Sequence, residues 1–152
     1  MLTCEISDEN RSSTIWDRST LYGMKAAFLS GAGDRIMAPF LDYCNKRLLC
    51  DRVPYAVEAY PEGGKRHLSG ESALFARVVT EGIFGIRPEG LHKFSFLPQV
   101  FDGLGEMKLE NIPICGGCYG IRIGRDGWVV TDGGKEIARG ETDGKRVEIR
   151  KG

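Results

Sequence analysis

The chain has 152 residues, 41% of them apolar, which is typical of one compact domain and argues against a disordered chain. Its 21 basic and 21 acidic residues give zero net charge, so no electrostatic partner such as nucleic acid is expected. No apolar run approaches the roughly 18 residues of a membrane span, so no membrane partner is expected either.

The N-terminal sequence shows neither the basic segment nor the apolar segment of a signal peptide, and location in the cytoplasm or the periplasm is left open. Five cysteines are an odd number, which argues against a disulfide framework. The Cys115–Cys118 spacing would suit zinc or a redox pair. However, no second ligand pair is close and strand-like sequence follows, so we interpret it as a turn with two thiols and expect no metal or cofactor.

Three helices are predicted in the first part of the chain. The first covers 19–31, with Ser19 as its N-cap, and is apolar nearly all round, which indicates burial on several sides. The second covers 34–49 and places Ile36, Phe40, Cys44 and Leu48 on one stripe, with Pro39 as a possible kink or restart. The third covers 70–84, with Ser69 as its N-cap and Leu74, Phe75, Val78 and Val79 on its apolar face.

After Pro88 the hydrophobic period changes from 3.6 to 2. The segments "KFSFL", "MKLENI", "YGIRI" and "RVEIR" alternate as strands do, and strands should dominate after about residue 92. Asp-Gly pairs at 126–127, 132–133 and 143–144 are hairpin-turn signals, so this part is predicted to be an antiparallel meander. The predicted class is therefore α+β, with a helical region over 1–88 and a β-rich domain over 89–152.

Three helices, one of them apolar all round, cannot bury themselves against one small sheet. The chain is therefore predicted to be part of a larger architecture. On its own it is expected to expose apolar helix faces and to self-associate through them.

The segment "HLSGESALFARVVTEGIFGIRPEG", followed by "HKFSFLPQ" and "MKLENI", resembles the C-terminal end of bacterial six-hairpin glycoside hydrolases, which are (α/α)6 barrels. The preceding "STIWDRSTLYGMKAAFLSGAGDRIMAPFLDYCNKRLL" resembles a helical hairpin of such a barrel, and the resemblance covers about residues 12–124. It implies a fold of C-terminal toroid hairpins followed by a small β domain. It also implies that the loops "SSTIWDR" and "VEAYPEGGKRHL", which precede inner helices, lie at the active-site mouth.

Hydrolysis of an O-glycosidic bond needs a carboxylic acid that protonates the leaving oxygen and a carboxylate that activates water or attacks the sugar. By the resemblance, the acid lies in a part of the barrel that this chain lacks, and the base lies near the last inner helices. Glu58 is the first candidate because its surroundings are apolar and aromatic; Glu62 lies in a turn-like sequence, and Asp17 stands where related segments carry Glu. Glu71 is a further candidate, but it is interpreted as a charge that favours the start of a helix.

Five further residues are candidates for binding a carbohydrate substrate. An aromatic ring can stack on the apolar face of a sugar, whereas basic side chains can bind sugar hydroxyls or an acidic sugar. Each of them could instead serve packing or an ordinary polar contact. These candidates are Trp16, Arg18, Tyr60, Arg66 and His67.

The expected function is thus that of a fragment of a glycoside hydrolase, inactive alone. Two alternatives stay open. One is part of a six-hairpin sugar phosphorylase, in which phosphate replaces water. The other is a non-catalytic carbohydrate-binding or interaction module. The sugar, the linkage and the stereochemical outcome do not follow from the sequence.

Overall fold

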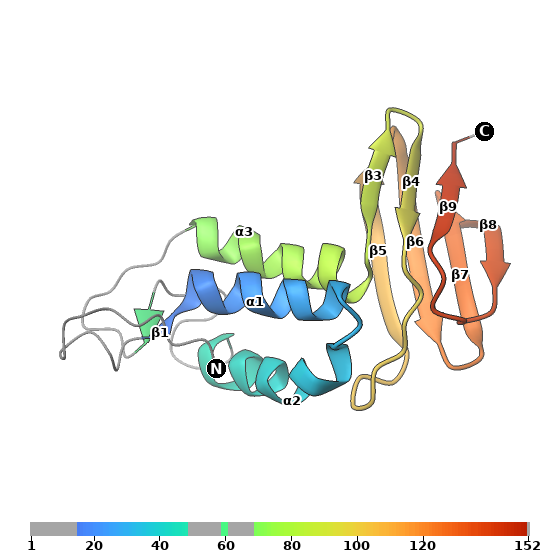
Figure 1. The fold of residues 1–152 in the computed structure, drawn as a ribbon. Helices are drawn as coiled ribbons and strands as arrows, with labels where there is room; N and C mark the ends of the chain where they lie inside the picture. Colours follow the sequence, from blue (N-terminus) through green and yellow to red (C-terminus); the bar gives the residue numbers. More distant parts are fainter. Residues whose placement is uncertain (1–14, 49–58, 61–68, 152) are drawn as a thin grey trace. The chain divides into compact units, whose positions relative to one another are not determined.

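The computed structural model describes residues 15–48, 59–60 and 69–151, and these form a mixed α+β chain (Figure 1). The predicted α+β class is confirmed. The chain divides into two compact units between Ile83 and Phe84, which are described separately below. Glu58, Glu62, Arg66 and His67 lie outside the described residues.

The first unit is mainly helical, with one short pair of strands. Its helices lie close to the ranges expected from the 3.6-residue period. In chain order the elements are β1 (Ile15–Trp16), α1 (Asp17–Leu29), α2 (Gly33–Tyr43), the π-helical turn η1 (Cys44–Leu48), β2 (Ala59–Tyr60), α3 (Ser69–Arg77) and the π-helical turn η2 (Val78–Ile83).

The start of α1 differs from the prediction. The N-cap is Trp16, which makes no side-chain cap, so the assignment of Ser19 as N-cap is wrong. The Thr20 hydroxyl donates a hydrogen bond back to the Trp16 carbonyl at 3.2 Å, and Asp17 supplies the acidic group of the first turn. A carboxylate in the first turn is favoured by the positive end of the helix dipole, which compensates for the missing cap.

Helix α2 continues through Pro39, and its buried face is rotated relative to the predicted stripe. Met37, Phe40 and Tyr43 are buried, whereas Ile36 and Cys44 are only half-buried. Tyr43 was not part of the predicted stripe. Its hydroxyl explains why it can face inward, since it has a hydrogen-bond partner there.

Aromatic contacts hold the helical core together. Phe28 of α1 meets Phe40 edge-on with centroids 5.5 Å apart, and Phe40 stacks on Phe75 of α3 at 6.1 Å. Phe40 of the predicted stripe on α2 therefore has neighbours inside the chain. Helix α1 buries only one side among the described residues, since Tyr22 and Leu29 are exposed. None of the helices in the described ranges is long and apolar enough to cross a membrane.

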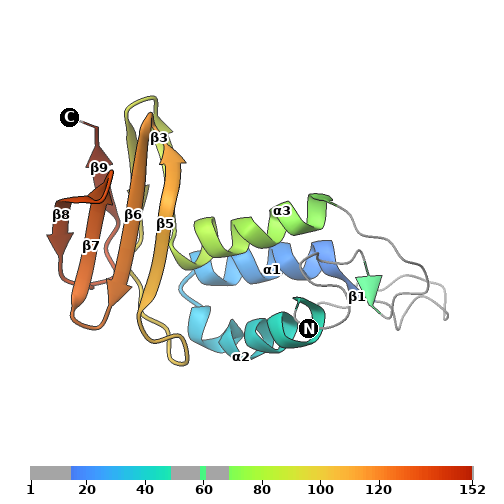
Figure 2. The same cartoon turned by 180° about the vertical axis from the view of Figure 1, so that it is seen from behind.

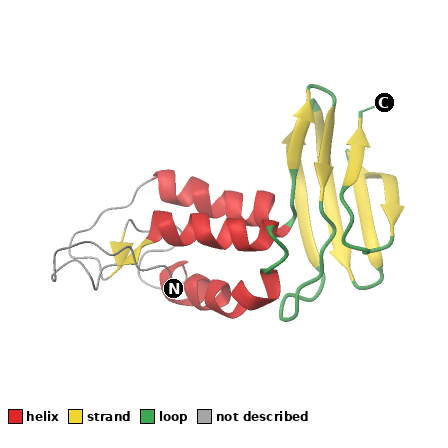
Figure 3. Ribbon diagram, in the orientation of Figure 1, coloured by secondary structure: helices red, strands yellow, loops and turns green. Residues whose placement is uncertain are grey.

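The second unit consists of strands joined by turns, shown in yellow and green in Figure 3. The three-stranded sheet has the order β3-β4-β9 and the four-stranded sheet the order β5-β6-β7-β8, and all pairings are antiparallel. The strands are β3 (Arg87–Gly90), β4 (Lys93–Phe96), β5 (Met107–Ile114), β6 (Gly117–Gly124), β7 (Gly127–Asp132), β8 (Lys135–Gly140) and β9 (Val147–Arg150).

The predicted meander holds for β5 to β8 but not for β4 and β9, which belong to the other sheet. Figure 2 shows the order β5-β6-β7-β8 of the meander. Strand β9 leaves the meander and pairs with β4, with Phe94 opposite Ile149. The Asp143-Gly144 pair therefore lies in a connection between two sheets, and its assignment to a hairpin is wrong. Local turn chemistry signals a reversal of the chain but does not say which strand is paired next.

Successive side chains of a strand point to opposite faces of the sheet, so each strand has a buried face and a solvent face. On β6, Tyr119, Ile121 and Ile123 are buried. Phe94 of β4 meets Tyr119 with centroids 4.9 Å apart, and Phe96 meets Trp128 edge-on at 5.3 Å. Aromatic residues of both sheets thus form the core of this unit.

The Cys-x-x-Cys segment forms the hairpin turn between β5 and β6. Ile114 pairs with Gly117, and the two residues between them, Cys115 and Gly116, have φ of 51° and 74°. Two consecutive positive φ values are typical of the tight turns that match the twist of a hairpin. The Cys115 thiol donates to the carbonyls of Gly90 and Lys93, and both cysteines of the segment are free thiols.

Candidate functional site

The short strands β1 and β2 bring together two segments that lie far apart in the sequence. Ile15 pairs with Tyr60, and Trp16 pairs with Ala59. Each strand belongs to one of the two loops expected at the mouth of an active site. Two of the segments proposed to form a common site are therefore neighbours in space.

Helices α1 and α3 begin at the same end of the helical unit. Arg18 near the start of α1 contacts Glu71 near the start of α3, and Lys25 further along α1 contacts Glu81, which follows α3. The two helices therefore run parallel, as Figure 1 also shows. Their N-terminal ends carry partial positive charge, and carboxylates are stabilised there.

The link between Arg18 and Glu71 is a charge-assisted pair of hydrogen bonds. Arg18 Nε and Nη2 donate to the same oxygen, Oε1 of Glu71, at 2.9 Å and 2.6 Å. The Glu71 side chain is fully buried, whereas 60% of the Arg18 side chain is exposed. A buried carboxylate thus holds a guanidinium group at the surface and fixes its orientation.

The second oxygen of Glu71 has no such partner. Oε2 is buried, and none of the described residues donates a hydrogen bond to it. A buried acceptor without a donor is costly. Glu71 is therefore held at this position by Arg18 and by the packing of α3, and it keeps one oxygen available for a further donor.

Asp17, next to Arg18 in the sequence, is also fully buried. Its Oδ2 accepts a hydrogen bond of 3.0 Å from the Tyr43 hydroxyl at the end of α2. Contacts of neighbouring residues 17 and 18 with Tyr43 and Glu71 thus connect all three helices at this end. The start of α1 is fixed by buried polar contacts, while Trp16 just before it is 36% exposed.

Three of the predicted site residues, Trp16, Asp17 and Arg18, are consecutive in the sequence and lie at the start of α1. Trp16 and Arg18 present exposed surface, whereas Asp17 does not. Tyr60 lies in β2, opposite Ile15. Glu58, Glu62, Arg66 and His67 remain predictions.

The sequence interpretation missed Tyr43, and it explained Glu71 only as a charge at the start of a helix. Glu71 does lie in the first turn of α3, but its burial and its bond to Arg18 were not predicted. A signal for Glu71 was present in the sequence, because Glu71, Leu74 and Val78 are spaced as one face of a helix. In the structure all three are buried. A carboxylate on the apolar stripe of a helix predicts a buried partner or a ligand. Within the described ranges, no group of three or more potential metal-ligating side chains is present.

No protein-family model matches the chain, and neither the curated proteins nor the solved structures contain a significant match. The candidate site therefore has to be interpreted from its own geometry.

Proposed function

We propose that the chain is the C-terminal part of a glycoside hydrolase of the six-hairpin type, acting on O-glycosidic bonds. The observation that carries the proposal is the shared end of α1 and α3. There, Trp16 and Arg18 are exposed beside two buried carboxylates, and strand pairing joins the two loops that precede these helices. An (α/α)6 toroid presents its active site at such an end of its inner helices, according to the resemblance described above.

In this proposal the exposed and the buried groups have different tasks. The Trp16 ring stacks on the apolar face of a sugar, and the Arg18 guanidinium donates to its hydroxyls or to a carboxylate. Glu71 holds Arg18, and the Tyr43 hydroxyl holds Asp17. Full burial of Asp17 favours positioning over direct attack, so the base is assigned to Glu58 or Glu62.

The chemistry requires two carboxyl groups. One donates a proton to the leaving oxygen, and the other removes a proton from the attacking water or attacks the sugar itself. The general acid is expected in helical hairpins upstream of those described. Residues 1–152 alone are therefore expected to hydrolyse no glycoside, and the exposed side chains of α1, Tyr22 and Leu29, are expected to promote self-association.

The test uses the complete reading frame that contains residues 1–152. Its upstream part should encode further helical hairpins, and the whole product should release the chromophore from one of a panel of aryl glycosides. Glu58→Gln or Glu62→Gln should then lower kcat by about a thousandfold, while the circular dichroism spectrum stays unchanged. Asp102→Asn, an exposed acidic residue of the second unit, is the control and should retain full activity.

Two results would reject the proposal. One is the absence of further hairpins upstream, and the other is a well-folded 152-residue monomer that hydrolyses glycosides by itself. Light scattering after size-exclusion chromatography measures the association state. Dependence of turnover on inorganic phosphate would instead identify a sugar phosphorylase.

A further inference from the structure

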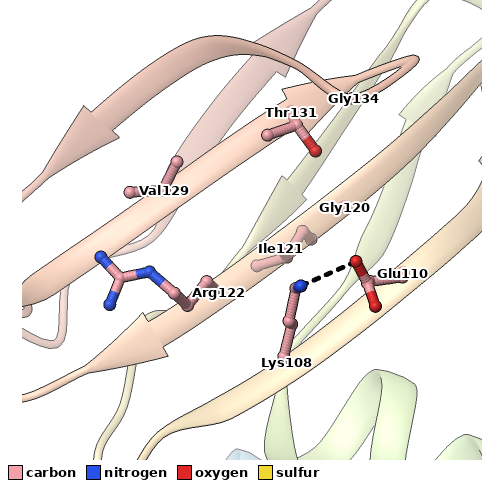
Figure 4. Close-up of a pocket in the computed structure, with 8 residues that line it drawn as sticks. All are labelled: Lys108, Glu110, Gly120, Ile121, Arg122, Val129, Thr131 and Gly134. Carbon is pink, nitrogen blue, oxygen red and sulfur yellow. Dashed lines mark ion pairs between the residues drawn. The ribbon is translucent and has the colours of Figure 1, made fainter.

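The solvent face of the four-stranded sheet carries a hollow of about 240 Å³ (Figure 4). Gly120 on β6 forms its floor. Lys108 and Glu110 of β5 lie on one side of Gly120, and Val129 and Thr131 of β7 lie on the other. The volume is somewhat below the range of about 300–1,000 Å³ typical of small-molecule sites. The hollow is therefore suited to one small ligand or to one unit of a chain.

The hollow exists because position 120 has no side chain. The neighbours Tyr119 and Ile121 point into the core of this unit, so residue 120 faces solvent. A Cβ atom at this position would lie 2.6 Å from Oγ1 of Thr131. Any larger residue would fill the floor or displace the Thr131 hydroxyl.

The charges around the hollow are already paired. Lys108 Nζ lies 2.7 Å from Glu110 Oε1, and Arg122 Nη1 lies 2.7 Å from Glu106 and 3.2 Å from Asp126. Three carboxylates thus surround two cations, so an anion would meet excess negative charge. A metal ion would find no cluster of three ligating side chains among the described residues.

We propose that this hollow binds a neutral saccharide. A sugar hydroxyl both donates and accepts hydrogen bonds, and the Lys108–Glu110 pair offers a donor and an acceptor side by side. The Thr131 hydroxyl can do both, and the Val129 side chain provides an apolar surface for the C–H groups of a sugar ring. The hollow is lined by residues of the second unit alone, so this proposal does not rest on the assignment of the chain to a glycoside hydrolase.

Titration of the 152-residue chain with maltohexaose, cellohexaose or xylohexaose tests the proposal. At least one of these sugars should give saturable NMR shifts at the amides of Gly120, Val129 and Thr131, and saturation-transfer signals on the sugar itself. Lys108→Ala and Gly120→Val should each weaken binding about tenfold, the effect of losing one good hydrogen bond or the space for the ring.

The matched control is Lys93→Ala, which removes a strand lysine that is paired with Glu148 at 2.8 Å in the other sheet. It should change the dissociation constant by less than about twofold. Because Lys108 is exposed, its variant keeps the test valid if Gly120→Val does not fold. The proposal is overturned if none of the three sugars binds, if Lys108→Ala and Lys93→Ala weaken binding equally, or if inorganic phosphate binds at the hollow while the sugars do not.

Discussion

Arg18 and Glu71 are 53 positions apart in the sequence, yet Arg18 Nη2 lies 2.6 Å from Glu71 Oε1. This pair joins the first turns of two parallel helices. It also places a buried carboxylate directly behind an exposed guanidinium group. The pair therefore combines a structural role in aligning α1 with α3 and a role in presenting Arg18 at the surface.

Replacing Arg18 with alanine should destabilise the helical unit by about 2 kcal/mol, because a fully buried carboxylate loses its cation. The loss is smaller than for a fully buried pair, since water reaches the exposed part of Arg18. Thermal unfolding followed by helical circular dichroism, at one fixed protein concentration, measures it. Adding Glu71→Gln to the Arg18→Ala variant should restore part of the stability, because a neutral amide costs less to bury unpaired.

Lys46→Ala is the control for this prediction. It removes an exposed Lys46–Asp42 ion pair of 2.8 Å in the same unit, and such pairs contribute little. An equal loss of stability in the Arg18→Ala and Lys46→Ala variants would mean that the Arg18–Glu71 pair has no special role.

Stability of the helical unit should also fall in acid through Glu81. Hydrogen bonding from Arg77, and then from Lys25, holds the pKa of the Glu81 carboxyl below its ordinary value of 4.5. A lowered folded-state pKa means that the stabilisation is fully present above pH 4.5 and is lost as the pH falls through the lowered value. The melting temperatures of the wild type and of Glu81→Gln should therefore differ at neutral pH and converge in strong acid. A difference that stays constant down to pH 2 would instead assign the effect to packing.

Periodicity and turn chemistry predicted the three helices and the strand-rich region after residue 92. They predicted neither the strands β1, β2 and β3 nor the contacts that define the candidate site. The helix positions follow from the 3.6-residue period, and the β5–β8 meander follows from alternation and from Gly-containing turns. The pairing of β9 with β4 and the bond from Tyr43 to Asp17 are long-range, and no local pattern encodes the partner. Glu71 lies in the first turn of α3, as the sequence predicted. Its burial and its bond to Arg18 were not predicted, because an acidic residue in a first turn has a sufficient local explanation.

We expect unequal roles for Cys115, which lies in the turn between β5 and β6, and Cys118, which lies on β6. Cys115→Val should destabilise the second unit by about 1–2 kcal/mol, because a β-branched residue is strained at a φ of 51° and the thiol hydrogen bonding to the Gly90 and Lys93 carbonyls is lost. Cys118 is exposed on β6, where valine is a good strand residue, so Cys118→Val should change stability little. Urea unfolding followed by the fluorescence of buried Trp128, in a Trp16→Phe background, separates the two. Equal effects would argue against a special role of Cys115 in this turn.

Gly85 should be hard to replace, because its φ is positive and another segment of the chain lies against it. Its φ is +60°, and an added Cβ would lie 2.5 Å from the Leu97 Cβ and 3.0 Å from the Leu97 backbone nitrogen. That nitrogen donates to the Phe84 carbonyl, and Arg146 donates to the carbonyl of Gly85 itself. Neither the segment at Gly85 nor the segment at Leu97 can therefore move freely. Gly85→Ala should therefore cost about 3 kcal/mol, the sum of backbone strain and overpacking.

Gly144 provides the comparison, with a φ of +71° and no heavy atom within 4 Å of an added Cβ. Gly144→Ala should cost only about 1 kcal/mol, the strain of the backbone alone, and Gly144→Asn should be nearly neutral, because asparagine tolerates this conformation. Gly85→Asn should remain as damaging as Gly85→Ala, because both substitutions introduce the Cβ atom that meets Leu97. The Trp128 unfolding assay measures all four variants. If asparagine restored stability at position 85 as it does at 144, the close approach of Leu97 would not be what requires glycine there.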